Sequence, residues 1–290
     1  MAARQFRRHL LLGAAGLLAG VVVVPHASGA DAGAKVTAIE VGILPYLPTA
    51  TLIGGHEALR HHLEDTFKRP VAVSTAPDFR SFQRRVLDGE FDFTIIGPGP
   101  GRQAQLDRDH QVVAMSKQLV RVFILVRKDS RINAMTELRG QTLATIDPLT
   151  VTAQMTAAML RDHGLTPGID VSIRYDKVPF NTVQSLVLGE VAAASFPNVS
   201  YAKLPAEIRD KVRVLRQSED IPGMLFMVRP AADMPTPEEF QATLFRFAET
   251  DAGRTYLQAF GHEGLIKPDP AALRALDRFV PETRRLLAAP

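Results

Sequence analysis

The chain has 290 residues, of which 46% are hydrophobic and 22% are charged, and it is formally +3 at neutral pH. These values are typical of a globular protein of one or two domains. The first 30 residues hold Arg4, Arg7 and Arg8 but no acidic residue, so the rest of the chain is formally neutral and gives no indication of nucleic-acid binding. The absence of cysteine excludes disulfides, thiolate metal ligands and a cysteine nucleophile.

Residues 1–32 have the features of an export signal. A basic opening precedes an apolar run at 10–24, which has the length of a signal-peptide core and is short for a membrane-spanning helix. The small residues that follow predict a mature N-terminus at Asp31 or Gly33. Arg7 and Arg8 also fit a twin-arginine signal, with the general secretory route as the alternative. No cysteine is present for lipid attachment, so we expect a free periplasmic protein.

After this segment, short apolar strands alternate with helical periodicity. The pattern predicts helices at 52–67 and 79–87, and strands at 36–44, 71–74, 91–96, 112–116 and 121–126. This alternation is typical of βαβ units and predicts a mainly parallel sheet flanked by helices. Ligands of such sheets bind beyond the carboxyl ends of the strands. We therefore expect the loops at 45–51, 75–78 and 97–101 to face a ligand.

A second unit of the same kind follows. Strands are expected at 142–146, 171–175, 192–196 and 212–215, and helices at 152–162, at 181–188 and near 201–211. A strand at 224–228 returns to the first unit, and helices at 237–260 (broken near 250–253) and 271–287 close the chain. The predicted fold is α/β with two lobes and a ligand cleft between them. Lobe 1 comprises 33–126 and 224–290, and lobe 2 comprises 127–223, with hinges near 126–128 and 222–225.

One strand–turn–helix stretch, residues 140–160, is a candidate for ligand contact. Asp147 and Pro148 end the strand, and Thr150 and Thr152 stand at the start of the helix. The first N–H groups of a helix lack partners inside it, and the helix dipole is positive there, so such a position can bind an anion. A threonine at this position can also serve only as the helix N-cap. Both uses fit the sequence.

A series of short segments, in order and in spacing, resembles one known family. These segments are Val41-Gly-Ile-Leu-Pro-Tyr-Leu-Pro48, Thr75-Ala-Pro-Asp-Phe79, Gly89-Glu-Phe-Asp-Phe-Thr-Ile-Ile-Gly-Pro98, Leu138-Arg-Gly140, Ile146-Asp-Pro148 and Gly189-Glu-Val191. They resemble the phosphate/phosphite/phosphonate-type periplasmic substrate-binding proteins of ABC transporters. The resemblance covers nearly the whole chain after residue 32. It implies a type II periplasmic binding protein fold, an oxyanion or phosphonate-like ligand and an inner-membrane ABC permease as partner.

The resemblance also implies where the ligand is contacted. The ligand-binding candidates are Tyr46, Pro98, Gly99, Thr150, Val151, Thr152 and Asn198. Several positions depart from the family pattern. Glycine replaces the family's aromatic residue after Gly-Pro, Ala153 adds a methyl group at the helix start, and Pro179-Phe180 replaces a histidine–acid pair.

Catalysis is not expected. The sequence contains no nucleophile elbow, Walker loop or zinc signature, and the strand-end loops hold glycine, proline and threonine rather than titratable residues. We therefore expect no cofactor, no metal and no catalytic residue. The expected function is capture of a small oxyanion between the lobes for delivery to an ABC transporter. The alternative is an accessory protein that presents its ligand-bound form to a membrane sensor such as a histidine kinase.

Overall fold

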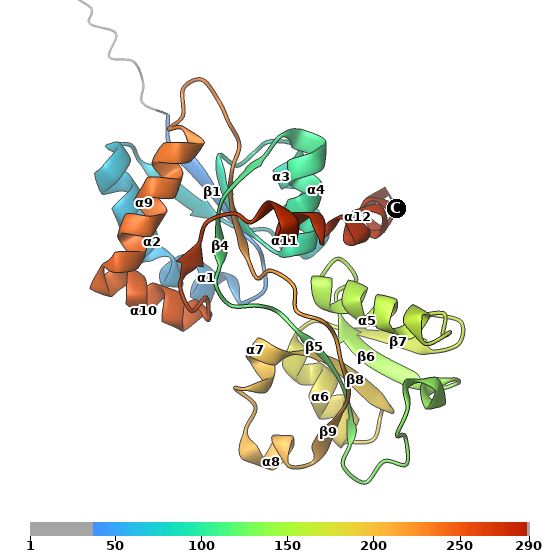
Figure 1. Ribbon diagram of the computed structural model, residues 1–290. Coiled ribbons are helices and arrows are strands. Elements are labelled where there is room, and N and C mark those ends of the chain that lie inside the picture. The colour runs from blue at the N-terminus through green and yellow to red at the C-terminus, as the bar shows by residue number, and fades with distance from the viewer. Residues whose placement is uncertain (1–36, 289–290) are drawn as a thin grey trace, which may run out of the picture. The chain divides into compact units, whose positions relative to one another are not determined.

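The computed structural model describes residues 37–288 (Figure 1). The predicted export signal at 1–32 and its cleavage sites lie outside these residues. Across the described part of the chain, no helix has both the length and the apolar character needed to cross a bilayer. Two α/β lobes are present, each built on one sheet.

The first lobe contains a six-stranded sheet in the order β11-β4-β10-β3-β1-β2. Strands β2, β1 and β3 run parallel, as predicted. Strand β10 pairs antiparallel with both β3 and β4, and β11 pairs antiparallel with β4, so the sheet is mixed. The strands are β1 Ile39–Ile43, β2 Val71–Ser74, β3 Phe93–Ile96, β4 Gln111–Ser116, β10 Leu225–Val228 and β11 Leu265–Ile266.

Helices cover both faces of this sheet (Figure 1). On one face, the rings of Phe93 and Phe240 stack at 5.5 Å and join the sheet to helix α9. The helices on this side are α1 Thr49–Gly55, α2 Glu57–Phe67, α9 Pro237–Glu249 and α10 Asp251–Phe260. The other face carries α3 Phe79–Leu87, α4 Pro98–Arg108, α11 Pro270–Arg274, a 3-10 turn at Asp277–Phe279 and α12 Val280–Ala288.

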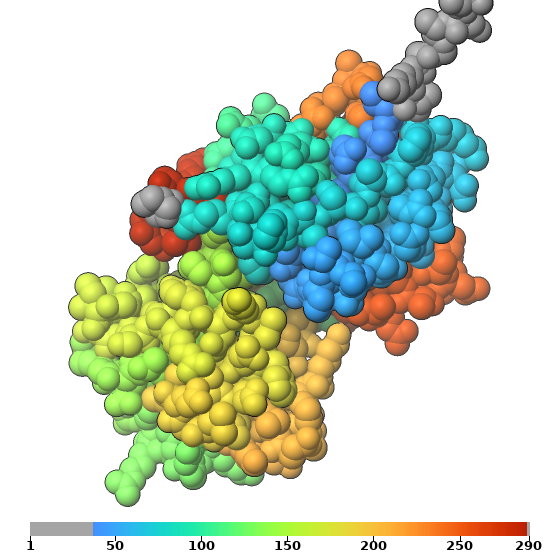
Figure 2. Space-filling model, turned by 180° about the vertical axis from the view of Figure 1, so that it is seen from behind, coloured from blue at the N-terminus to red at the C-terminus, as the bar shows by residue number. Residues whose placement is uncertain are grey.

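The second lobe contains a five-stranded sheet in the order β7-β6-β8-β5-β9. Its strands are β5 Val122–Arg127, β6 Thr142–Ile146, β7 Ser172–Asp176, β8 Ala193–Pro197 and β9 Val212–Gln217. Its helical segments are a 3-10 turn at Met135–Leu138, α5 Val151–Asp162, α6 Pro179–Val187, α7 Asn198–Tyr201 and α8 Ala206–Arg209. Figure 2 shows the molecule from behind. The surface formed by α1, α2 and α3 of the first lobe is blue to cyan there, and the surface formed by α6 and α7 of the second lobe is yellow to light orange.

Several expected elements differ in the structure. The helix expected at 52–67 is divided at His56 into α1 and α2, and the helix expected near 201–211 consists of the two short helices α7 and α8. The loop expected at 97–101 is instead the start of helix α4. Pro98 occupies the first helical position, where its fixed φ angle suits the helix. Its missing N–H costs nothing there, because the first N–H groups of a helix have no acceptor inside the helix. Gly101 fits here because a Cβ would lie only 2.9 Å from Leu225 Cδ1. The single helix expected at 271–287 is divided into α11, the 3-10 turn and α12.

The chain crosses between the sheets at residues 117–121 and returns at 218–224. The first crossing was expected near 126–128, and this was wrong, because β5 pairs antiparallel with β8 and β9 and so belongs to the second sheet. The return falls in the expected region. The two crossing segments pair with each other: the Val120 N–H donates to the Ile221 carbonyl at 2.9 Å and the Ile221 N–H donates back at 3.0 Å.

Candidate ligand-binding site

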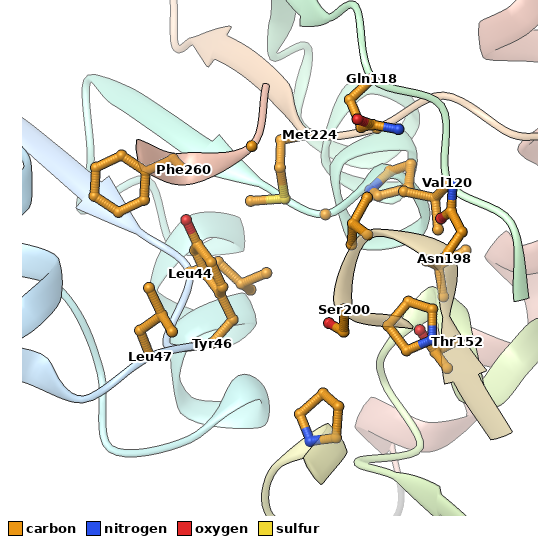
Figure 3. A pocket seen from close by; sticks show the side chains of 18 of the residues that line it. Leu44, Tyr46, Leu47, Gln118, Val120, Thr152, Asn198, Ser200, Met224 and Phe260 are labelled. Carbon is orange, nitrogen blue, oxygen red and sulfur yellow. The ribbon is translucent and has the colours of Figure 1, made fainter. Parts of the chain in front are cut away.

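A pocket of about 960 Å³ lies beyond the carboxyl ends of β1, β3, β6 and β8. Its lining comes from both lobes and from both crossing segments, which is where the sequence places the ligand cleft. Side chains of the first lobe face those of the second across the space (Figure 3). The labelled residues are Leu44, Tyr46, Leu47 and Phe260 from the first lobe, Thr152, Asn198 and Ser200 from the second, and Gln118, Val120 and Met224 from the crossings.

The start of helix α5 forms one wall. Thr150 is the N-cap: its hydroxyl donates to the Asp147 carbonyl at 2.7 Å and accepts from the Ala153 N–H at 3.3 Å. The capping role is therefore confirmed for Thr150. The N–H groups of Val151 and Thr152 have no acceptor within the helix. No hydrogen bond within residues 37–288 engages the Thr152 hydroxyl, although this residue is largely buried in the pocket wall.

Asn198 also lines the pocket, but its side chain is already engaged. Its Oδ1 accepts from the Arg121 N–H at 2.9 Å, and its Nδ2 donates to the Leu119 carbonyl at 3.1 Å. The Asn198 N–H donates to the Arg121 carbonyl at 2.8 Å. This residue therefore fastens the end of β8 to the first crossing segment, a role that the sequence did not predict.

The first-lobe candidates have different positions. Tyr46 and Pro98 line the pocket, whereas Gly99 is not part of the lining. Gly99 faces helix α5, where a Cβ would lie 3.3 Å from Gln154 Oε1. Burial raises the pKa of Tyr46, so its side chain is a neutral hydroxyl at physiological pH. Pro98 has no N–H, so the start of α4 offers fewer donors than the start of α5.

Charged side chains are few, and cations outnumber anions among them. Lys177, Lys203, Arg254 and Glu263 line the pocket. Arg254 already pairs with Asp251 on its own helix. The remaining charges are two lysines and one glutamate, and they favour an anionic ligand modestly.

Sequence reasoning missed much of the first-lobe wall. Met224, Leu257 and Phe260 line the pocket, although the patterns around them predict only core strand and helix. They reach the pocket through the return of the chain and the end of α10. Behind Phe260 lies a buried group of His56, Tyr256 and His262, and the rings of His56 and Phe260 are 4.4 Å apart.

This buried group changes the acid–base behaviour of its members. Burial lowers the pKa of His56. Burial, together with the nearby His56, lowers the pKa of His262 to about 4. Burial raises the pKa of Tyr256, so all three side chains are neutral at physiological pH. His56 Nε2, Tyr256 Oη and His262 Nε2 have no hydrogen-bond partner within residues 37–288.

Solved structures share this architecture. XAC2383 from Xanthomonas citri bound to chloride aligns with a TM-score of 0.75 at 18% identity, covering 86% of this chain and 99% of that one. PhnD1 from Prochlorococcus marinus in complex with methylphosphonate aligns with a TM-score of 0.73 at 12% identity, covering 86% and 98%. A binding protein component of an ABC phosphonate transporter from Pseudomonas aeruginosa gives 0.70 at 15% identity, covering 87% and 89%. No curated protein matches the chain in sequence.

The fold is therefore that of a two-lobed, type II periplasmic binding protein, as predicted. The model of the family described as "ABC transporter, phosphonate, periplasmic substrate-binding protein" matches residues 41–273. The chain belongs to this family, which confirms the resemblance found in its sequence. The family consists of substrate-binding components of transporters rather than enzymes.

Proposed function

We propose that this protein is exported, captures a phosphonate-like oxyanion between its two lobes and delivers it unchanged to an ABC permease of the inner membrane. The observation that carries the proposal is the start of helix α5. There the N–H groups of Val151 and Thr152 and the Thr152 hydroxyl have no hydrogen-bond partner within residues 37–288 and lie at a pocket shared by both lobes. Family membership supports the transporter as partner over a sensor kinase.

The oxyanion is held by hydrogen bonds and by the helix dipole rather than by a cluster of cations. The N–H groups of Val151 and Thr152 and the Thr152 hydroxyl donate to it. Lys177 adds positive charge from the same lobe. Hydrogen bonds to a charged group each contribute about 1.5–3 kcal/mol, so a few of them suffice for micromolar binding.

Binding favours closure of the lobes, because contacts from both walls are made only when the walls approach each other. Tyr46 and Pro98 supply the first-lobe side, and the start of α5 supplies the second. A ligand that binds the closed form more tightly shifts the population toward it. The closed, loaded form is then the one that the permease recognises. The segment at 1–32, with its basic start and apolar core, supports delivery to the periplasm.

Two single substitutions separate ligand contact from capping. Thr152→Val keeps the shape and removes only the unpaired hydroxyl, so affinity for methylphosphonate should fall about tenfold while thermal stability is unchanged. Thr150→Val removes the N-cap, so the free energy of unfolding should fall by about 1 kcal/mol. Isothermal titration calorimetry and urea denaturation measure the two effects. If Thr152→Val binds as tightly as the unmodified protein, the ligand does not use this helix start as proposed.

A further inference from the structure

The pocket is much larger than a bare oxyanion. Its volume of about 960 Å³ lies at the upper end of the range of about 300–1,000 Å³ that is typical of sites for drug-sized molecules. The donors at the start of α5 occupy only one wall. A phosphate or methylphosphonate group bound there leaves most of the pocket surface without a ligand contact.

The wall opposite these donors is apolar. Leu44, Leu47, Met224 and Phe260 lie there, with the ring of Tyr46 among them (Figure 3). A ligand that presented polar groups to this wall would lose their hydration without gaining hydrogen bonds. An apolar group of the ligand would instead bury its surface against it.

Two amide side chains of the lining are already engaged by the protein. The Asn198 carboxamide is bonded to the first crossing segment. Gln118 Nε2 donates to the Leu119 carbonyl at 3.1 Å. The amide nitrogens of these two residues therefore have acceptors in the protein, whereas other polar lining residues, Ser200 and Gln258 among them, can still contact a ligand.

Phe260 is held in place by its surroundings. Its ring lies 4.4 Å from that of His56 and 5.0 Å from that of Tyr256. Gly55 leaves the room for it, because a Cβ there would lie 2.5 Å from Phe260 Cζ. The aromatic surface at this end of the pocket is therefore a fixed part of the wall.

Apolar side chains also stand exposed at the edges of the cleft. Leu47 on the first lobe is 39% exposed, and Phe180 on the second, next to the lining residue Pro179, is 43% exposed. Single exposed apolar side chains are ordinary on protein surfaces, so these two residues only extend the apolar lining at the edge of the cleft.

We propose that the ligand is an oxyanion that carries an apolar organic group of about six carbons or more, such as a longer alkyl- or arylphosphonate. This inference rests on the proposed function and names the ligand class of the same site. The oxyanion binds at the start of α5, and the organic group lies across the pocket against Leu47, Met224 and Phe260. Inorganic phosphate and methylphosphonate fill only the first of these two regions.

Calorimetry with the purified mature protein tests this with four probes: inorganic phosphate, methylphosphonate, hexylphosphonate and phenylphosphonate. Each buried methylene strengthens binding about fourfold, so hexylphosphonate should bind at least a hundredfold more tightly than methylphosphonate. Phe260→Ala and Leu47→Ala should each weaken hexylphosphonate binding severalfold and leave methylphosphonate binding unchanged. Leu106→Ala, which truncates an exposed apolar side chain outside the pocket, should change neither.

The outcomes separate this inference from the proposed function. If methylphosphonate binds as tightly as hexylphosphonate, the inference is refuted and the proposed function stands. If none of the four probes binds, the proposed function fails, and the inference fails with it. The Leu47→Ala variant keeps the test valid if Phe260→Ala does not fold, because Leu47 is exposed and its truncation leaves the core intact.

Discussion

His262 should make the protein less stable as the pH falls through the weakly acidic range. Its side chain is 2% exposed, and burial with the neighbouring His56 lowers its pKa from 6.5 to about 4. In the unfolded chain the imidazole takes up a proton near pH 6.5. Between pH 6.5 and 4 the unfolded state therefore binds more protons than the folded state. The free energy of unfolding consequently falls as the pH is lowered and recovers fully above 6.5.

The size of the effect follows from the pKa difference. One pKa unit corresponds to about 1.36 kcal/mol, so His262 accounts for a loss of about 3 kcal/mol by pH 4. His262→Asn removes the titrating group and keeps a polar side chain. In urea denaturation between pH 7.5 and 4, the unmodified protein should lose about 3 kcal/mol more than this variant. His61→Gln, which replaces a histidine whose side chain is 62% exposed, should follow the unmodified protein.

Parallel stability curves for the unmodified protein and His262→Asn would refute this reasoning. They would mean that the imidazole is protonated in the folded state at the same pH as in the unfolded chain. A buried cation among aromatic rings would then need a partner, and none is present around His262 Nε2 within residues 37–288.

Two further substitutions test the crossing and the first-lobe core. Gly223→Ala places a Cβ 2.3 Å from the Gln118 carbonyl oxygen, so the free energy of unfolding should fall by about 1–3 kcal/mol. Its control is Gly54→Ala, which should not reduce stability because a Cβ there meets nothing within 4 Å. Asp92→Ala removes a 4% exposed carboxylate that accepts from an arginine and from a β1 N–H, and it should cost about 2 kcal/mol without changing ligand affinity. Asp129→Ala, at an exposed ion pair, should cost under about 1 kcal/mol. Chemical denaturation measures the free energy of unfolding of all four variants. The structural argument is contradicted if Gly223→Ala loses less stability than Gly54→Ala, or if Asp92→Ala loses less than Asp129→Ala.

Local sequence patterns predicted most of the fold, because the strands and helices themselves depend mainly on interactions between residues that are close in sequence. The apolar runs of β1, β3, β6 and β8 and the periodicity of the helices between them depend on near neighbours. The break between α9 and α10 was also predictable, since Thr250 ends one helix and its hydroxyl accepts from the Gly253 N–H at 2.9 Å to begin the next. The place of β5 was not predictable in this way. A buried apolar strand fits either sheet, and only pairing with distant β8 and β9 decides which sheet it joins.

The site was predictable where it follows strand ends and not where it depends on returning segments. Tyr46 and the start of α5 follow directly from β1 and β6, and both line the pocket. Phe260 arrives from the end of α10, more than 200 residues after Tyr46, and no local pattern marks it. Asn198 also lines the pocket at a strand end, and its amide hydrogen bonds are made to the protein itself, so its contact with a ligand stays a prediction.

These hydrogen bonds locate the pivot of the proposed closure. On the first-lobe side, the Gln118 N–H donates to the His262 carbonyl at 3.0 Å, and the Met224 carbonyl accepts from Ser116 at 2.9 Å. On the second-lobe side, the Asn198 side chain forms hydrogen bonds with the backbone of Leu119 and of Arg121. Between these two residues, Val120 exchanges backbone hydrogen bonds with Ile221. If the lobes close as proposed, residues 119–121 and 221 are expected to move with the second lobe. The backbone dihedral changes of this closure would then fall at residues 118–119 and 222–223. The second of these links contains Gly223, which has no Cβ, so the two crossing segments can pass close to each other.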